Sequence, residues 1–138
     1  MVKSLSPHKI LIVRTFVCFC FLLLSLTVFS QKRDQIRILR AESLEGVERD
    51  GQKAQKLIGD VQFSHQNAIM YCDSAFLFSK ANTLHAFGSV RINQADTSNL
   101  YGDKLVYDGN TKIARVTGKT VKLINEDFTL TTTELTMN

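Results

Sequence analysis

Two aspartates and two histidines are the side chains in this 138-residue sequence whose types first suggest chemistry. Asp73 and Asp103 could form an acid–base pair, and His65 with His85 could bind a metal ion. However, the two aspartates occupy equivalent positions of a repeat, which is typical of turn or register residues. Each histidine lies near the end of an expected strand in polar surroundings, which is typical of a solvated side chain. We therefore predict no catalytic residue, no metal site and no cofactor.

The remaining motifs give no support to an enzyme. The sequence contains no nucleophile elbow, no phosphate-binding glycine loop and no Cys or His pair at metal-ligand spacing. A β-helix lyase is the best enzymatic alternative, but it would need clustered Asp, Arg and Lys, and the charges here are scattered. Cys72 is the only cysteine after residue 20, so no intrachain disulfide is expected there. A lone cysteine of this kind is most often a small buried apolar residue.

A phrase of about thirty residues recurs along most of the chain. Gly59, Gly88 and Gly118 lie 29 and 30 residues apart, and each opens a short run: GDVQFSH, GSVRINQ and GKTVKLI. A second anchor follows each glycine: MYCDSAFLF, LYGDKLVYD and LTTTELTM. A repeat of this period predicts a stacked array in which each unit supplies one supersecondary layer.

The repeats predict an all-β fold. Residues 61–65 and 90–93 alternate apolar and polar side chains, which is the pattern of a strand with one buried face. Residues 119–124 alternate one position later, which indicates a bulge beside Gly118. Turn residues follow at 94–96, 108–110 and 125–127. About three strands per unit would fold into two facing sheets, a sandwich or a V-shaped trough. Residues 31–47 are the one helical candidate, and the repeat favours a strand for their second half.

Residues 1–30 have the pattern of a secretory signal peptide. Lys3, Lys9 and Arg14 precede an uncharged apolar stretch at 15–29, and cleavage is expected after Ser30. An uncleaved anchor is the alternative; it would have to include Arg14 in a full-length span or be short. Without the three leader cations, 14 basic residues face 13 acidic ones, a net charge of +1. This balance gives no support to nucleic-acid binding.

The repeat resembles that of the OstA-like family, which includes lipopolysaccharide-transport proteins of the LptA type and the periplasmic domain of LptD. The resemblance is carried by GDVQF with CDSA, by GSVRI with YGDKL, and more weakly by residues 41–44 and 133–135. It implies an open β-jelly-roll, a V-shaped two-sheet trough of ~30-residue repeats spanning residues 31–138. It also implies a periplasmic carrier of lipopolysaccharide or a related glycolipid. The expected interior residues are Val61, Phe63, Met70, Val90, Ile92, Leu100, Leu105 and Tyr107.

The last expected strand suggests an edge for assembly. It is rich in threonine, contains one charge and has no proline, so its edge has little protection against pairing. We expect it to pair with other OstA-like domains of the inner- and outer-membrane components and to allow head-to-tail self-association, through Thr129, Thr131, Thr133 and Leu135. The chain stops without a capping turn, which is compatible with a longer repeat domain cut short. The alternative function is a structural β-repeat scaffold of the cell envelope with no lipid ligand.

Overall fold

The computed structural model describes residues 6–24 and 34–138. They belong to two separate units, residues 1–33 and 34–138. In the first unit, α1 spans Pro7–Leu24. No helix of the described ranges, α1 included, is long and apolar enough to cross a membrane. The expected cleavage site after Ser30 lies outside the described residues.

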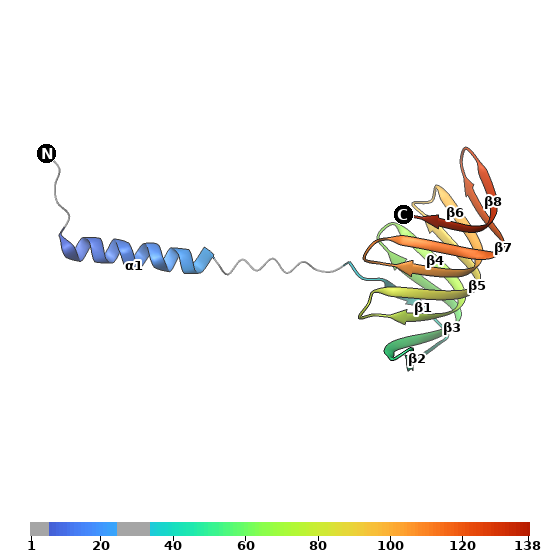
Figure 1. Cartoon of the computed structure of the whole chain (residues 1–138), viewed down its shortest axis with the longest axis horizontal. Coiled ribbons are helices and arrows are strands. Elements are labelled where there is room, and N and C mark those ends of the chain that lie inside the picture. Colours follow the sequence, from blue (N-terminus) through green and yellow to red (C-terminus); the bar gives the residue numbers. More distant parts are fainter. Residues whose placement is uncertain (1–5, 25–33) are drawn as a thin grey trace. The chain divides into compact units, whose positions relative to one another are not determined.

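Residues 34–138 form one antiparallel eight-stranded sheet. Its order is β1-β3-β4-β5-β6-β7-β8, and β2 pairs with β3 beside β1. The chain therefore runs through the sheet as a meander, which Figure 1 shows as a stack of neighbouring strands. The strands are β1 Arg37–Arg40, β2 Ser43–Arg49, β3 Gln52–His65, β4 Ala68–Phe78, β5 Thr83–Gln94, β6 Ser98–Asp108, β7 Ile113–Asn125 and β8 Thr129–Met137. The all-β prediction and the predicted turns are confirmed, as is the strand in the second half of residues 31–47.

Each repeat supplies two long strands, so the expectation of about three strands per unit was wrong. At each anchor glycine the long strand continues through a bend, and its pairing register shifts there. We call this row of bends the fold line.

The fold line consists of β-bulges. Gly59 and Asp60 lie opposite Asp73 alone, and Gly88 and Ser89 lie opposite Asp103 alone. The two glycines have φ angles of 84° and 79°, values in the left-handed region that glycine adopts without steric cost. An extra residue in one strand bends it and increases its twist. The repeated glycine therefore folds every second long strand at the same level.

In β7 the bend holds one residue more. Gly118, Lys119 and Thr120 lie opposite Thr133 alone. This insertion moves the alternation of the following residues by one position. It confirms the bulge that the sequence indicated beside Gly118.

The fold line divides the sheet into two arms. Arm A contains β1 and the strand halves that meet the turns at 66–67, 95–97 and 126–128. Arm B contains β2 and the halves that meet the turns at 50–51, 79–82 and 109–112. On a flat sheet His65 and Tyr107 would lie three strands apart and at opposite ends, with strands about 4.8 Å apart. Instead their side chains meet at 2.7 Å. The two arms therefore fold toward each other over a common interior.

The interior is built from ladders of apolar side chains, one step per strand. In arm A the ladder is Phe63, Met70, Ile92, Leu100, Leu123 and Leu130. In arm B it is Leu57, Ala75, Ala86, Leu105, Val116 and Leu135. Both ladders thus lie inside one core, although Leu130, on the last strand, remains 42% exposed.

Candidate functional site

The eight residues expected to line the interior are all buried and belong to one hydrophobic cluster. Arm A contains four of them, Phe63, Met70, Ile92 and Leu100, and arm B contains Leu105 and Tyr107. Val61 and Val90 flank the fold line. The structure therefore brings together residues that are up to 46 positions apart in the sequence (107−61).

In this structure the side chains of the two arms fill most of the space between them. A hollow of about 130 Å³ lies where the arms meet the turns, lined by side chains of both arms: His65, Ala68, Met70, Ile92, Tyr107, Ala114 and Met137 among them. We call this opening the mouth. Sites for small ligands usually enclose about 300 Å³ or more. A long acyl chain would therefore require the arms to separate or the interior side chains to move.

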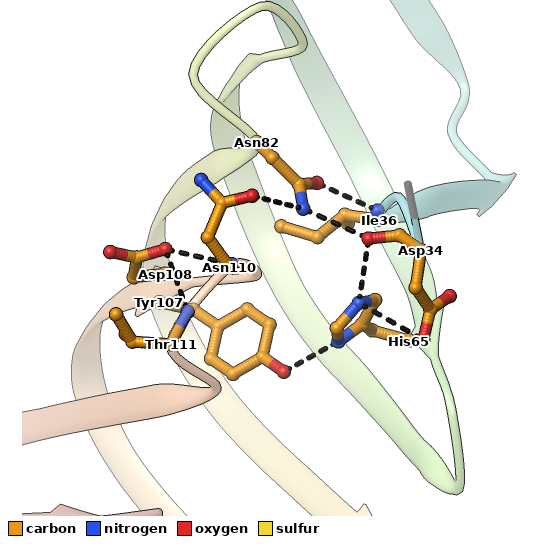
Figure 2. A network of polar contacts seen from close by, with 8 residues as sticks. All are labelled: Asp34, Ile36, His65, Asn82, Tyr107, Asp108, Asn110 and Thr111. Atoms are coloured by element: carbon orange, nitrogen blue, oxygen red, sulfur yellow. Dashed lines mark hydrogen bonds and ion pairs between the residues drawn. The ribbon is translucent and has the colours of Figure 1, made fainter. Parts of the chain in front are cut away.

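His65 and Tyr107, which line the mouth, belong to a group of polar side chains whose contacts Figure 2 shows. The Nε2 atom of His65 lies 3.2 Å from the carbonyl oxygen of Asp34, which can only accept, so Nε2 carries the proton. In the neutral ring, Nδ1 then accepts a hydrogen bond from the Tyr107 hydroxyl at 2.7 Å. The Asp34 carboxylate lies 3.6 Å from Nε2. His65 comes from arm A and Tyr107 from arm B, so this bond joins the two arms directly.

Asn82 ties the segment 34–36 to arm B. The Ile36 N–H donates to Asn82 Oδ1 at 3.0 Å, and Asn82 Nδ2 donates to the Asp34 carbonyl at 3.0 Å. The Asn82 carbonyl accepts from the N–H of Gly109 at 2.8 Å, which links two turns of arm B. Segment 34–36 thus lies between His65 and Asn82, with the Ile36 side chain in the core. His65, Tyr107, Asn82 and segment 34–36 are the mouth cluster.

Among the described residues, three side chains have shifted pKa values, and burial is the first cause for each. Burial, followed by the nearby Asp34 and Asp108 carboxylates, raises the pKa of Tyr107. Burial, followed by the charge of Asp73, raises the pKa of Cys72 to about 12, so the thiol is protonated at neutral pH. The prediction that Cys72 is buried is confirmed. Burial, followed by the charges of Arg49 and Lys104, lowers the pKa of His85.

The prediction that His65 is a solvated surface side chain was wrong. Its side chain is fully buried beneath the segment 34–36. The sequence places His65 at a strand end beside Gln66 and Asn67, and nothing local indicates that a segment thirty residues earlier covers it. Asn82 was missed for the same reason. Its φ of 54° is a backbone conformation that asparagine tolerates in turns, but its three partners come from distant segments. His85 is half-buried beside the Phe78 ring.

The carboxylates singled out at the start lie on the fold line. A methyl group added to Gly88 would collide with the carboxylate of Asp73, and one added to Gly118 would collide with that of Asp103. Asp103 Oδ2 also accepts the backbone N–H of Lys119 at 3.0 Å. This confirms that the aspartates are register residues of the bends. In the described part of the chain no three His, Cys, Asp or Glu side chains are grouped to hold a metal ion.

The four residues of the expected assembly edge lie on β8. Thr129, Thr131 and Thr133 are exposed, and Leu135 is half-buried against the core. Among residues 34–138, β8 pairs only with β7. At the other end of the sheet, the structure has an open hollow of about 850 Å³ between residues 51–55 and 77–81.

A family model described as OstA-like protein matches residues 33–138, which is most of the chain and includes the whole β unit. No curated protein matches the sequence.

Proposed function

The chain belongs to the OstA-like protein family, and we propose that it is a periplasmic component of lipopolysaccharide transport and outer-membrane assembly. In this proposal the β unit is a carrier or bridge that holds acyl chains of lipopolysaccharide or a related glycolipid between its arms. The expected signal peptide would export it. The chain's own role in the proposal is binding, without an enzymatic step.

The observation that carries the proposal is the pair of apolar ladders on facing arms of a sheet that does not close. A closed barrel would trap a lipid, whereas a folded open sheet can admit it along the mouth and release it at an end. Each methylene group moved from water to an apolar interior contributes about 0.8 kcal/mol. A few methylenes would thus offset the loss of several hydrogen bonds at the mouth, each worth about 1 kcal/mol.

One observation favours the alternative, a structural β-repeat scaffold with no lipid ligand. The interior is already packed, because Leu57, Phe63 and Leu105 have no exposed surface. A lipid would have to replace these contacts. The two functions therefore differ in whether the arms separate when lipid is present.

The proposal includes assembly with other OstA-like domains of the inner and outer membrane. The edge of β8 offers backbone N–H and C=O groups to an incoming strand. Pairing there would extend the apolar ladders into a neighbouring domain, either a different OstA-like protein or a second copy of this chain.

Photo-crosslinking to lipopolysaccharide tests the lipid claim. We expect a photoreactive residue at Phe63 or Ile92 to capture lipid and the same residue at outward Gln62 or Arg91 to capture little. Because Phe63 and Ile92 are buried, Leu130 is a third position: it belongs to the same ladder but is 42% exposed, so a larger side chain fits. Circular dichroism must first show that each variant keeps its β structure.

Equal labelling of inward and outward positions would contradict the trough. An unchanged melting temperature on addition of lipopolysaccharide, with no labelling at any position, would favour the scaffold.

A further inference from the structure

The two edge strands of the sheet differ in how well they are protected against pairing with another strand. At the β8 edge the outward side chains are threonines and a single Glu134, and the apolar Leu130 is exposed. At the other edge, β1 and β2 carry many charges: Arg37, Arg40, Glu45, Glu48 and Arg49. Their pairing with β3 is also irregular between Ile38 and Arg40. Charges and bulges are the features that keep an edge strand from pairing, so the β8 edge is the better one for association.

Chain direction separates the ways in which two copies could meet. The chain passes from arm A to arm B along β1 and then β2, and it passes from arm A to arm B again along β8. In a head-to-tail stack, β8 of one copy would therefore lie parallel to β1 and β2 of the next. All the strand pairs within the sheet are antiparallel, and parallel pairing is slightly less stable per residue. The head-to-tail order would also use the charged edge.

A two-fold arrangement avoids both difficulties. If the two-fold axis passes between Thr133 and Glu134, the two β8 strands run antiparallel. Leu130 then lies opposite Met137 of the second copy, and Thr132 lies opposite Leu135. All four face the interior, because their partners on β7 are the interior residues Leu123, Ala114, Val121 and Val116. Outward Thr131 lies opposite outward Thr136 of the second copy.

Because of the bend in β8, every inward residue lies opposite an inward residue of the second copy, and every outward residue lies opposite an outward one. Thr132 and Leu135 both face inward although they are three positions apart, because the fold line lies between them. A straight strand would bring an inward residue opposite an outward one in this register. The two Glu134 carboxylates would lie near the axis, and each already receives the Nε–H of Arg115 at 2.6 Å.

We propose that two copies of this chain associate tail to tail through β8, as an antiparallel two-fold dimer with one continuous interior. This inference rests on the proposed function only in taking β8 as the assembly edge. The contact is isologous, so it closes at two copies, whereas a head-to-tail contact would continue into longer stacks.

Cysteine cross-linking of the full chain separates the two arrangements. The test uses a Cys18→Ser, Cys20→Ser background with Thr131→Cys and Thr136→Cys added. On one strand these positions lie five residues apart, at about 3.4 Å per residue, which is too far for an intrachain disulfide. In the two-fold dimer each lies opposite its counterpart in the second copy. We expect oxidation to give a covalent dimer and no larger species.

A matched control variant carries Thr136→Cys with Glu45→Cys, which would meet only in the head-to-tail order; we expect no cross-linking. Light scattering of the unmodified chain should show the mass doubling with concentration and then remaining constant. A ladder of trimers and longer species would overturn the tail-to-tail proposal while keeping β8 as an edge. A monomer at all concentrations would overturn both the tail-to-tail dimer and the use of β8 as an assembly edge. Neither result bears on the lipid claim, which the photo-crosslinking tests separately.

Discussion

At the residue scale, the mouth cluster joins the two arms through the His65–Tyr107 hydrogen bond. His65 and Asn82 are the buried polar side chains of the core, and both are fully used in hydrogen bonds. Within the described residues no buried side-chain nitrogen or oxygen lacks a partner. Since an unpaired buried polar group costs more than a bond contributes, removing one partner should weaken the closed state markedly.

Replacing Tyr107 by Phe removes only the hydroxyl group, which donates a hydrogen bond to His65 Nδ1. The nitrogen then remains buried without a partner, so we expect the free energy of unfolding to fall by about 1–3 kcal/mol. Urea unfolding measures this change.

The matched control is Tyr101→Phe, which removes a hydroxyl from a side chain that is 37% exposed on the outer face. Its effect should stay within about 0.5 kcal/mol. Equal effects of the two substitutions would mean that the His65–Tyr107 bond does not hold the arms together.

At the element scale, two kinds of long strand alternate along the sheet. One kind bends at a glycine, as in β3 and β5, and the other carries the acidic side chain that packs against the neighbouring glycine, as in β4. Glu42, between β1 and β2, serves the same purpose for Gly59. The bend thus depends on a contact between two strands as well as on glycine itself.

Gly88→Ala tests this bend. At φ 79° a non-glycine residue costs about 1–2 kcal/mol, and the new methyl group would also collide with Asp73. We expect a loss of at least about 2 kcal/mol in urea unfolding.

Gly46→Ala in β2 is the control, because nothing lies within 4 Å of the added Cβ. Alanine is normally more favourable than glycine inside a strand by roughly 0.5–1 kcal/mol, so this variant should be unchanged or slightly more stable. A neutral Gly88→Ala would show that the bend tolerates an ordinary residue.

The periodicity of the sequence predicted the long strands well, because a strand with one buried face leaves a local pattern of alternating side chains. Val61, Phe63, Val90 and Ile92 alternate with polar residues, and this alternation, repeated at a fixed period, predicted the strands, their buried faces and these interior positions. The mouth was not predictable in this way. His65 is buried by a segment thirty residues away, and a local pattern carries no information about such a contact.

At the scale of the whole molecule, residues 34–138 form a unit with its own core, and the first 33 residues are a separate one. The strands of the β sheet all come from the second unit. Segment 34–36, which follows the expected cleavage site, contributes to the mouth cluster.

We expect export to remove residues 1–30, so that N-terminal sequencing of the exported protein begins at Gln31. The fragment 31–138 should give the circular dichroism of a β protein and unfold cooperatively in urea. A fragment that begins at Ile38 should unfold more easily, because it lacks Asp34 and Ile36. A membrane-bound protein that begins at Met1 would instead establish an anchor.

The alternation of two kinds of strand also limits how such a molecule can evolve in length. One added strand would place two strands of the same kind side by side and reverse the direction of everything after it. A glycine strand and its acidic neighbour must therefore be gained or lost together, as one hairpin. At about 4.8 Å per strand, the distance that the sheet spans changes in steps of about 10 Å.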